Sequence, residues 1–140
     1  PLQGAAVKPA RPLHVLAAED NAVNREVLAA MIDLAGHRVT FAEDGAAAVR
    51  AAQAQRFDLV LMDLHMPELD GIGATRAIRA MSGPIARVPI VALTADVFPE
   101  TRARCLEAGM DGFLTKPVGL PELAQLLARH VAAAPATAAA

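Results

Sequence analysis

Five polar side chains stand just after short apolar runs of this 140-residue chain, and their types are those of a reactive site. They are Glu19 and Asp20 after the first run, Asp63 after the third, Thr94 after the fourth and Lys116 after the fifth. Three carboxylates brought to one place carry a charge of −3, and like charges a few ångströms apart repel by several kcal/mol at intermediate dielectric. We therefore expect cations among them.

Magnesium is the cation that suits this set of groups. Mg²⁺ prefers oxygen ligands and keeps waters of its own, and its charge together with that of Lys116 balances the three carboxylates. Histidine and cysteine side chains are not placed to compete as zinc ligands.

A carboxylate beside Mg²⁺, with a hydroxyl and an ammonium group opposite, can accept a phosphoryl group. Asp63 would attack phosphorus in line, while the metal and Lys116 neutralise equatorial oxygens and Thr94 donates a hydrogen bond to another. The product is a mixed anhydride that water hydrolyses. This chemistry favours a transient signal over a store of phosphate.

The elements that must position these residues alternate regularly. Short apolar runs predict strands at 13–17, 38–42, 58–62, 88–93 and 112–115, and helical periods predict helices at about 23–34, 45–55, 72–81, 97–108 and 120–131. Several runs are apolar almost throughout, which is typical of parallel strands covered on both faces. Five such units predict a doubly wound α/β sheet with helices on both faces, and ligands bind such sheets at the carboxyl ends of the strands.

The first helix has apolar residues at spacings of three and four, which predicts its buried face. These residues are Val23, Val27, Ala30, Met31 and Leu34. Gly36 follows where a left-handed cap would end the helix, and either Asp20 or Asn21 could begin it.

The motifs around the five polar residues resemble the receiver domain of two-component response regulators. They are Glu19-Asp20-Asn21, LVLMDLHMPELDG around Asp63, Ala92-Leu93-Thr94-Ala95 and Lys116-Pro117. The resemblance covers about residues 12–131 and leaves 1–11 as a linker or tail and 132–140 as an Ala-rich tail. It implies a flavodoxin-like (βα)₅ fold with strand order 2-1-3-4-5.

The resemblance also implies a role for each site residue. Asp63 is the phosphoacceptor, and Glu19, Asp20, Asp63 and the backbone carbonyl of His65 bind Mg²⁺. Thr94 and Lys116 sense the phosphoryl group, and the domain catalyses its own phosphorylation and dephosphorylation.

Phe113 matches the aromatic switch position of the family. The ring is expected to turn inward behind Thr94 and remodel the face made by the fourth helix, fifth strand and fifth helix. Phe in place of the commoner Tyr lacks the hydroxyl, and the Lys116–Pro117 bond is expected to be cis.

Two longer segments, EDNAVNREVLAAMIDLAGH and CLEAGMDGFLTKP, resemble receivers attached to hybrid sensor histidine kinases. The implied partners are the dimerisation and phosphotransfer domain of a histidine kinase as donor and a histidine phosphotransfer domain as acceptor. Asn21 and the first helix would border the docking surface. We expect a cytoplasmic domain, cut from a longer histidine kinase that could be anchored in the inner membrane.

Composition excludes other partners and leaves several alternatives. A net charge of −2 and 3% aromatic residues argue against nucleic-acid binding, and no apolar run is long enough to cross a membrane. A flavodoxin-like electron carrier would need a phosphate cradle where Glu19-Asp20 stand, and a phosphohydrolase would need an acid where His65 stands. A stand-alone response regulator and a docking module that is not phosphorylated remain as alternatives.

Overall fold

A computed structural model describes residues 12–66, 69–95 and 98–133 of the chain. Five parallel strands form one sheet in the order β2-β1-β3-β4-β5. The strands are β1 (His14–Ala18), β2 (Arg38–Ala42), β3 (Leu59–Asp63), β4 (Ile90–Thr94) and β5 (Gly112–Thr115). The predicted fold class and strand order are confirmed, with β1, β3 and β4 ending one residue later than expected.

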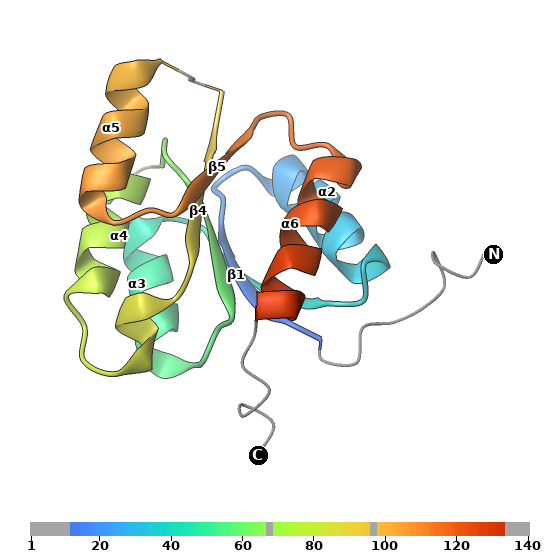
Figure 1. The fold of residues 1–140 in the computed structure, drawn as a ribbon, viewed down its shortest axis with the longest axis horizontal. Helices are drawn as coiled ribbons and strands as arrows, with labels where there is room; N and C mark the ends of the chain where they lie inside the picture. Colours follow the sequence, from blue (N-terminus) through green and yellow to red (C-terminus); the bar gives the residue numbers. More distant parts are fainter. Residues whose placement is uncertain (1–11, 67–68, 96–97, 134–140) are drawn as a thin grey trace.

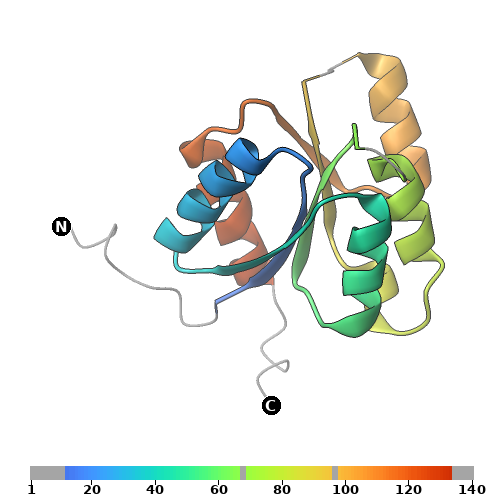
Figure 2. The same ribbon diagram turned by 180° about the vertical axis from the view of Figure 1, so that it is seen from behind.

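In the described residues, five α-helices and one short 3₁₀ helix alternate with the strands, and the last helix follows β5. They are α2 (Ala22–Leu34), α3 (Gly45–Ala54), α4 (Gly71–Arg79), η1 (Pro84–Arg87), α5 (Pro99–Ala108) and α6 (Leu120–Ala133). Helices α2 and α6 cover one face of the sheet, and α3, α4 and α5 cover the other (Figures 1 and 2). The turn η1 is not predicted, and α6 continues into the expected tail, whose remainder lies outside the described residues, as does segment 1–11.

Short polar side chains begin three of the helices. Asn21, Asp44 and Asp70 each accept a hydrogen bond from the backbone N–H three residues on, at 3.0, 2.7 and 2.8 Å. Such caps stabilise a helix by about 1 kcal/mol. Because Asn21 caps α2, the capping role considered for Asp20 falls to its neighbour.

The apolar core lies on both sides of the sheet. Every residue of β3 and β4 is buried, so alternate side chains of each strand enter opposite layers. Met62, Ile78 and Ile90 belong to the layer under α3, α4 and α5, and Leu28 and Leu127 to the layer under α2 and α6. Burying a side chain of this size stabilises the fold by about 1.5–3 kcal/mol.

The predicted buried face of α2 is wrong for Val23, Val27 and Leu34, although Met31 packs against the core as expected. Leu28 and Ile32 face the sheet, whereas Val23, Val27 and Leu34 are 64%, 47% and 68% exposed. The helix carries two apolar stripes at helical spacing, and only one of them can pack on the sheet. The other stripe is therefore open to solvent.

Among the described residues, no helix combines the length and the apolar character that crossing a membrane requires.

Candidate functional site

Glu19 is held in place from several sides at the end of β1. Its backbone N–H donates to the carbonyl of Ala42 at 3.0 Å, and its carboxylate Oε2 accepts from the backbone N–H of Asn21 at 3.2 Å. Its side chain is 1% exposed, whereas the neighbouring Asp20 is exposed. Of the two carboxylates, one is thus buried in the site and the other faces solvent at its rim.

Asp63 is the last residue of β3 and is 2% exposed. Its Oδ1 accepts a hydrogen bond from the backbone N–H of His65 at 3.0 Å, which fixes the plane of the carboxylate. Gly71, the first residue of α4, packs directly against the backbone of Asp63. A Cβ at this position would collide with the carbonyl oxygen of Asp63, so the close approach requires glycine. The strand end and the helix start therefore hold Asp63 rigidly.

The three carboxylates converge as the sequence predicts. One oxygen from each of Glu19, Asp20 and Asp63 lies within 4.8 Å of the others. Oxygen atoms at this spacing can ligate one small cation, and their combined charge favours a divalent one. Neither histidine nor cysteine belongs to the cluster.

Lys116 supplies the positive charge inside the site. Its Nζ lies 2.9 Å from Oδ2 of Asp63 and 3.1 Å from Oε1 of Glu19. Burial lowers the pKa of Lys116, but the hydrogen bond to Asp63 and the ion pairs with Asp63 and Glu19 outweigh it, so the pKa lies above its ordinary value. The ammonium group is therefore protonated at every physiological pH.

One ammonium does not satisfy the acidic cluster. Oε1 of Glu19 is fully buried and, among the described residues, receives no aligned hydrogen bond, although it is ion-paired with Lys116. A buried carboxylate oxygen with unfilled acceptor capacity, in a set made only of oxygen donors, suits Mg²⁺. The residues present therefore fit the expected metal.

Thr94 ends β4 beside Thr115 of β5 and is 2% exposed. Its carbonyl accepts the backbone N–H of Lys116 at 2.9 Å, so the ends of β4 and β5 are tied together. The Lys116–Pro117 bond is cis, as expected. Strand pairing thus brings Thr94 and Lys116 to the sheet edge where Asp63 lies.

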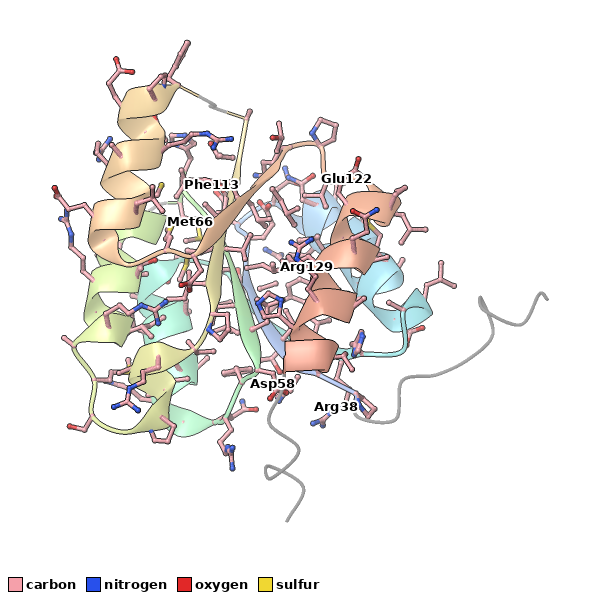
Figure 3. All side chains as sticks on the ribbon, in the orientation of Figure 1. Arg38, Asp58, Met66, Phe113, Glu122 and Arg129 are labelled. Atoms are coloured by element: carbon pink, nitrogen blue, oxygen red, sulfur yellow. The ribbon has the colours of Figure 1, made fainter. Side chains whose placement is uncertain are left out.

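Phe113 lies on β5, on the side of the sheet that α5 covers (Figure 3). The ring is half-buried against the core layer that includes Met66, and the guanidinium carbon of Arg102 lies 4.8 Å from its centroid. This distance is that of a cation–π contact. Arg102 is thus a partner of Phe113 that sequence reasoning did not identify.

Arg25 makes a second contact in the site that the sequence does not predict. Its Nη1 donates to the backbone carbonyl of Glu19 at 2.9 Å. A side chain that binds a backbone atom six residues away leaves no periodic signal in the sequence.

An apolar groove adjoins the acidic cluster. It measures about 420 Å³ and is lined by Glu19, Asn24, Val27, Leu28, Leu93, Ala95, Lys116, Pro117 and Val118. The exposed stripe of α2 forms one of its walls through Val27. The groove therefore joins an apolar surface to the carboxylates.

Comparison with known proteins gives consistent matches over most of the chain. Residues 15–128 match the family model of the response regulator receiver domain. Sensor protein GacS of Pseudomonas syringae pv. syringae is 42% identical over 119 residues, which cover 84% of this chain and 13% of GacS. The chain therefore spans about an eighth of the length of this curated relative.

Two solved structures are similar in fold. The receiver domain of sensor histidine kinase PA1611 from Pseudomonas aeruginosa PAO1, with a magnesium ion coordinated in its active site cleft, is 46% identical with a TM-score of 0.80, over 88% of this chain and 100% of that chain. The co-crystal structure of the Saccharomyces cerevisiae histidine phosphotransfer protein Ypd1 with the receiver domain of Ssk1 matches with 30% identity and a TM-score of 0.79, over 90% and 92% of the two chains.

The family match spans far more than half of the chain, and the two solved receiver domains have similar folds, with TM-scores of 0.80 and 0.79. The chain belongs to the response regulator receiver domain family.

Proposed function

We propose that this domain accepts a phosphoryl group on Asp63 from a phosphohistidine. The observation that carries the proposal is the arrangement of Asp63, Lys116 and Glu19, with the Lys116 ammonium within 3.1 Å of both carboxylates at the carboxyl edge of the sheet. An electron carrier has no use for a buried acidic cluster of this kind. A phosphohydrolase of the aspartyl type would need an acid where the exposed His65 stands.

The transfer is an in-line displacement at phosphorus. A carboxylate oxygen of Asp63 forms the new P–O bond, the P–N bond to the donor histidine breaks, and its electron pair returns to the imidazole. Lys116 is protonated and placed to neutralise negative charge on one phosphoryl oxygen. The Thr94 hydroxyl would donate a hydrogen bond to another phosphoryl oxygen. The backbone N–H of His65 orients the carboxylate for attack.

Glu19, Asp20, Asp63 and the backbone carbonyl of His65 would hold Mg²⁺. When bound, the ion supplies the positive charge that brings a phosphoryl group up to an otherwise negative pocket. Support comes from the oxygen-only cluster of this chain and from the related PA1611 receiver, whose structure contains magnesium in its active site cleft.

Thr94 and Phe113 are proposed as the switch that reports phosphorylation. Their strands are neighbours, and Phe113 lies beneath α5. Movement of Thr94 toward the phosphoryl group would let the ring turn inward and alter the face of α5, β5 and α6. Because Phe113 has no hydroxyl, packing and the contact with Arg102 must position its ring.

The groove beside α2 is proposed as the surface that receives the histidine-bearing helix. Its apolar wall leads to the acidic cluster, so a docked helix would present its phosphohistidine to Asp63. The donor would be a kinase dimerisation domain and the acceptor a histidine phosphotransfer domain, in a cytoplasmic part of a hybrid sensor histidine kinase. Support comes from the sensor-protein relative and from the Ypd1 complex with a similar receiver domain.

Incubation with acetyl phosphate and Mg²⁺, followed by intact-mass measurement, tests the chemistry. We expect one added phosphoryl group on the wild-type chain and none on Asp63→Asn. Asp33→Asn, at an exposed position on α2, is the control and should be modified normally. An unmodified wild-type chain would support a docking module instead. Rapid turnover of a small phosphomonoester would support a phosphohydrolase.

A further inference from the structure

The peptide that joins Glu19 to Asp20 is held by a side chain outside the acidic cluster. Arg25, one turn into α2, donates from Nη1 to the carbonyl oxygen of this peptide at 2.9 Å. The carbonyl belongs to the bond between two of the three clustered carboxylates.

The other polar groups of Glu19 have partners of their own. Its N–H is bound to Ala42, and its carboxylate contacts Asn21 and Lys116. Asp20, by contrast, is exposed, and the direction of its side chain depends on how the preceding peptide is turned. The hydrogen bond from Arg25 fixes that turn.

Arg25 is itself well supported for this task. It is half-buried, and it lines a shallow hollow between α2 and β2 together with Ala22, Glu26, Ala29 and Phe41. The apolar stem of an arginine is stabilised by such surroundings, and a planar guanidinium held there loses little freedom on binding a carbonyl.

We propose that Arg25 is a positioning residue for the divalent-cation site, which it serves by holding the Glu19–Asp20 peptide so that the Asp20 carboxylate faces Glu19 and Asp63. The inference rests on the proposed function, because it assumes that these carboxylates bind Mg²⁺. Groups that orient metal ligands commonly change affinity when they are removed.

Charge and geometry make opposite predictions for this residue. Arg25 is a cation near a cation site, so its positive charge by itself weakens Mg²⁺ binding. If charge alone mattered, Arg25→Gln would bind Mg²⁺ more tightly than the wild type. If Arg25 orients the peptide, the same substitution weakens binding.

The experiment is a Mg²⁺ titration of the metal-free chain, followed by backbone amide shifts in ¹H–¹⁵N NMR spectra. We expect the dissociation constant of Arg25→Gln to rise about tenfold, the low end of the effects seen for groups that orient metal ligands. The ¹³C shift of the Glu19 carbonyl should change at the same time, because its hydrogen bond is lost. Arg50→Gln, which removes an exposed positive charge on α3, is the matched control and should bind Mg²⁺ as the wild type does.

Arg25→Lys provides a second variant that keeps the charge and can still donate, and it should fall between Arg25→Gln and the wild type. A folded Arg25→Gln that binds Mg²⁺ equally well or more tightly overturns the proposal. A wild-type chain that binds no Mg²⁺ would instead overturn the proposed function, so the two failures are distinguishable.

Discussion

The Asp63 carboxylate places a third negative charge beside Glu19 and Asp20, and Lys116 balances only part of it. The site is therefore built for binding cations and phosphoryl groups at the expense of the stability of the metal-free chain. Within the part of the chain that the structure describes, Oε1 of Glu19 is buried without an aligned hydrogen bond. The charge of Asp63 therefore favours binding of cations and phosphoryl groups but lowers the stability of the metal-free chain.

Asp63→Asn should stabilise the metal-free protein. The amide keeps the shape of the side chain and can still accept from Lys116, while one of three like charges is removed. In the presence of a chelator, we expect the free energy of unfolding in urea to rise by about 1 kcal/mol. Added Mg²⁺ should then stabilise the wild type more than the variant, since ligand binding stabilises only the state that binds it. Equal stabilisation of both proteins would contradict the assignment of Asp63 as a ligand.

His37 makes stability depend on pH at the opposite edge of the sheet. Its buried Nδ1 accepts the backbone N–H of Leu13 at 2.8 Å, and burial lowers the pKa of His37 below 6.5 in spite of the charge of Asp58. The unfolded chain therefore takes up a proton at a higher pH than the folded chain does. The free energy of unfolding should fall as the pH drops below 6.5, by at most about 1.4 kcal/mol per pH unit for each proton.

Urea unfolding between pH 7.5 and 5.5 (roughly one unit above and below the pKa of free histidine) measures this dependence. His37→Asn keeps an acceptor at the position of Nδ1 but does not titrate, so we expect it to lose part of the pH dependence. His14, whose pKa is lowered first by burial and then by Arg38, should supply a remaining part. An unchanged pH profile in His37→Asn would show that His37 is not involved.

At the scale of elements, one arginine joins the helices and strands of the α3, α4 and α5 layer. Arg79 at the end of α4 donates to the carbonyls of Ala86, Val88 and Gly109 at 2.6–3.0 Å. It also pairs with Asp111 at 2.9 Å, and Asp111 accepts from the N–H of Ile90 as well. The starts of β4 and β5 and the end of α5 are thus fixed at one point, away from the strand ends that carry Thr94 and Lys116.

Arg79→Met should destabilise the protein by about 2–4 kcal/mol, because several carbonyls and a carboxylate lose a charged donor together. Phosphorylation of the folded variant by acetyl phosphate should continue at the wild-type rate. Arg76→Met is the matched control on the same helix, since its 3.7 Å ion pair with Glu107 is largely exposed and such pairs are worth about 0–1 kcal/mol. Thermal unfolding of the three proteins measures the difference, and equal losses in both variants would refute the special role of Arg79.

At the scale of the whole molecule, the sequence predicts the fold class and the strand order. Short, fully apolar runs such as 59–62 are typical of strands covered on both faces, and polar residues directly after such strands lie at one edge of a parallel sheet. The sequence alone therefore predicts that Asp63, Thr94 and Lys116 lie at the same edge of the sheet. In the structure, the Lys116 ammonium lies 2.9 Å from Asp63 and 3.1 Å from Glu19.

The features that the sequence does not predict depend on contacts between distant segments. Two stripes of α2 have the same spacing, so periodicity cannot show that Leu28 faces the sheet while Val27 faces solvent. The partners of Arg25, Arg79 and Phe113 lie on other elements or are backbone atoms, which periodicity does not record.

The exposed stripe of α2 lies beside the acidic cluster but is not part of it, so docking of a partner can be impaired without changing the chemistry at Asp63. Val27 lines the groove but is not part of the acidic cluster, so Val27→Gln should leave phosphorylation by acetyl phosphate unchanged. With a phosphohistidine-bearing phosphotransfer domain that phosphorylates the wild-type chain, we expect the transfer rate at low donor concentration to fall about tenfold, because a polar group would replace an apolar contact at the centre of the interface. Leu106→Gln, a similar change at an exposed position on α5, should transfer normally. If both variants accept phosphate from the protein donor as fast as the wild type does, the partner docks on another surface, although Asp63 would remain the acceptor.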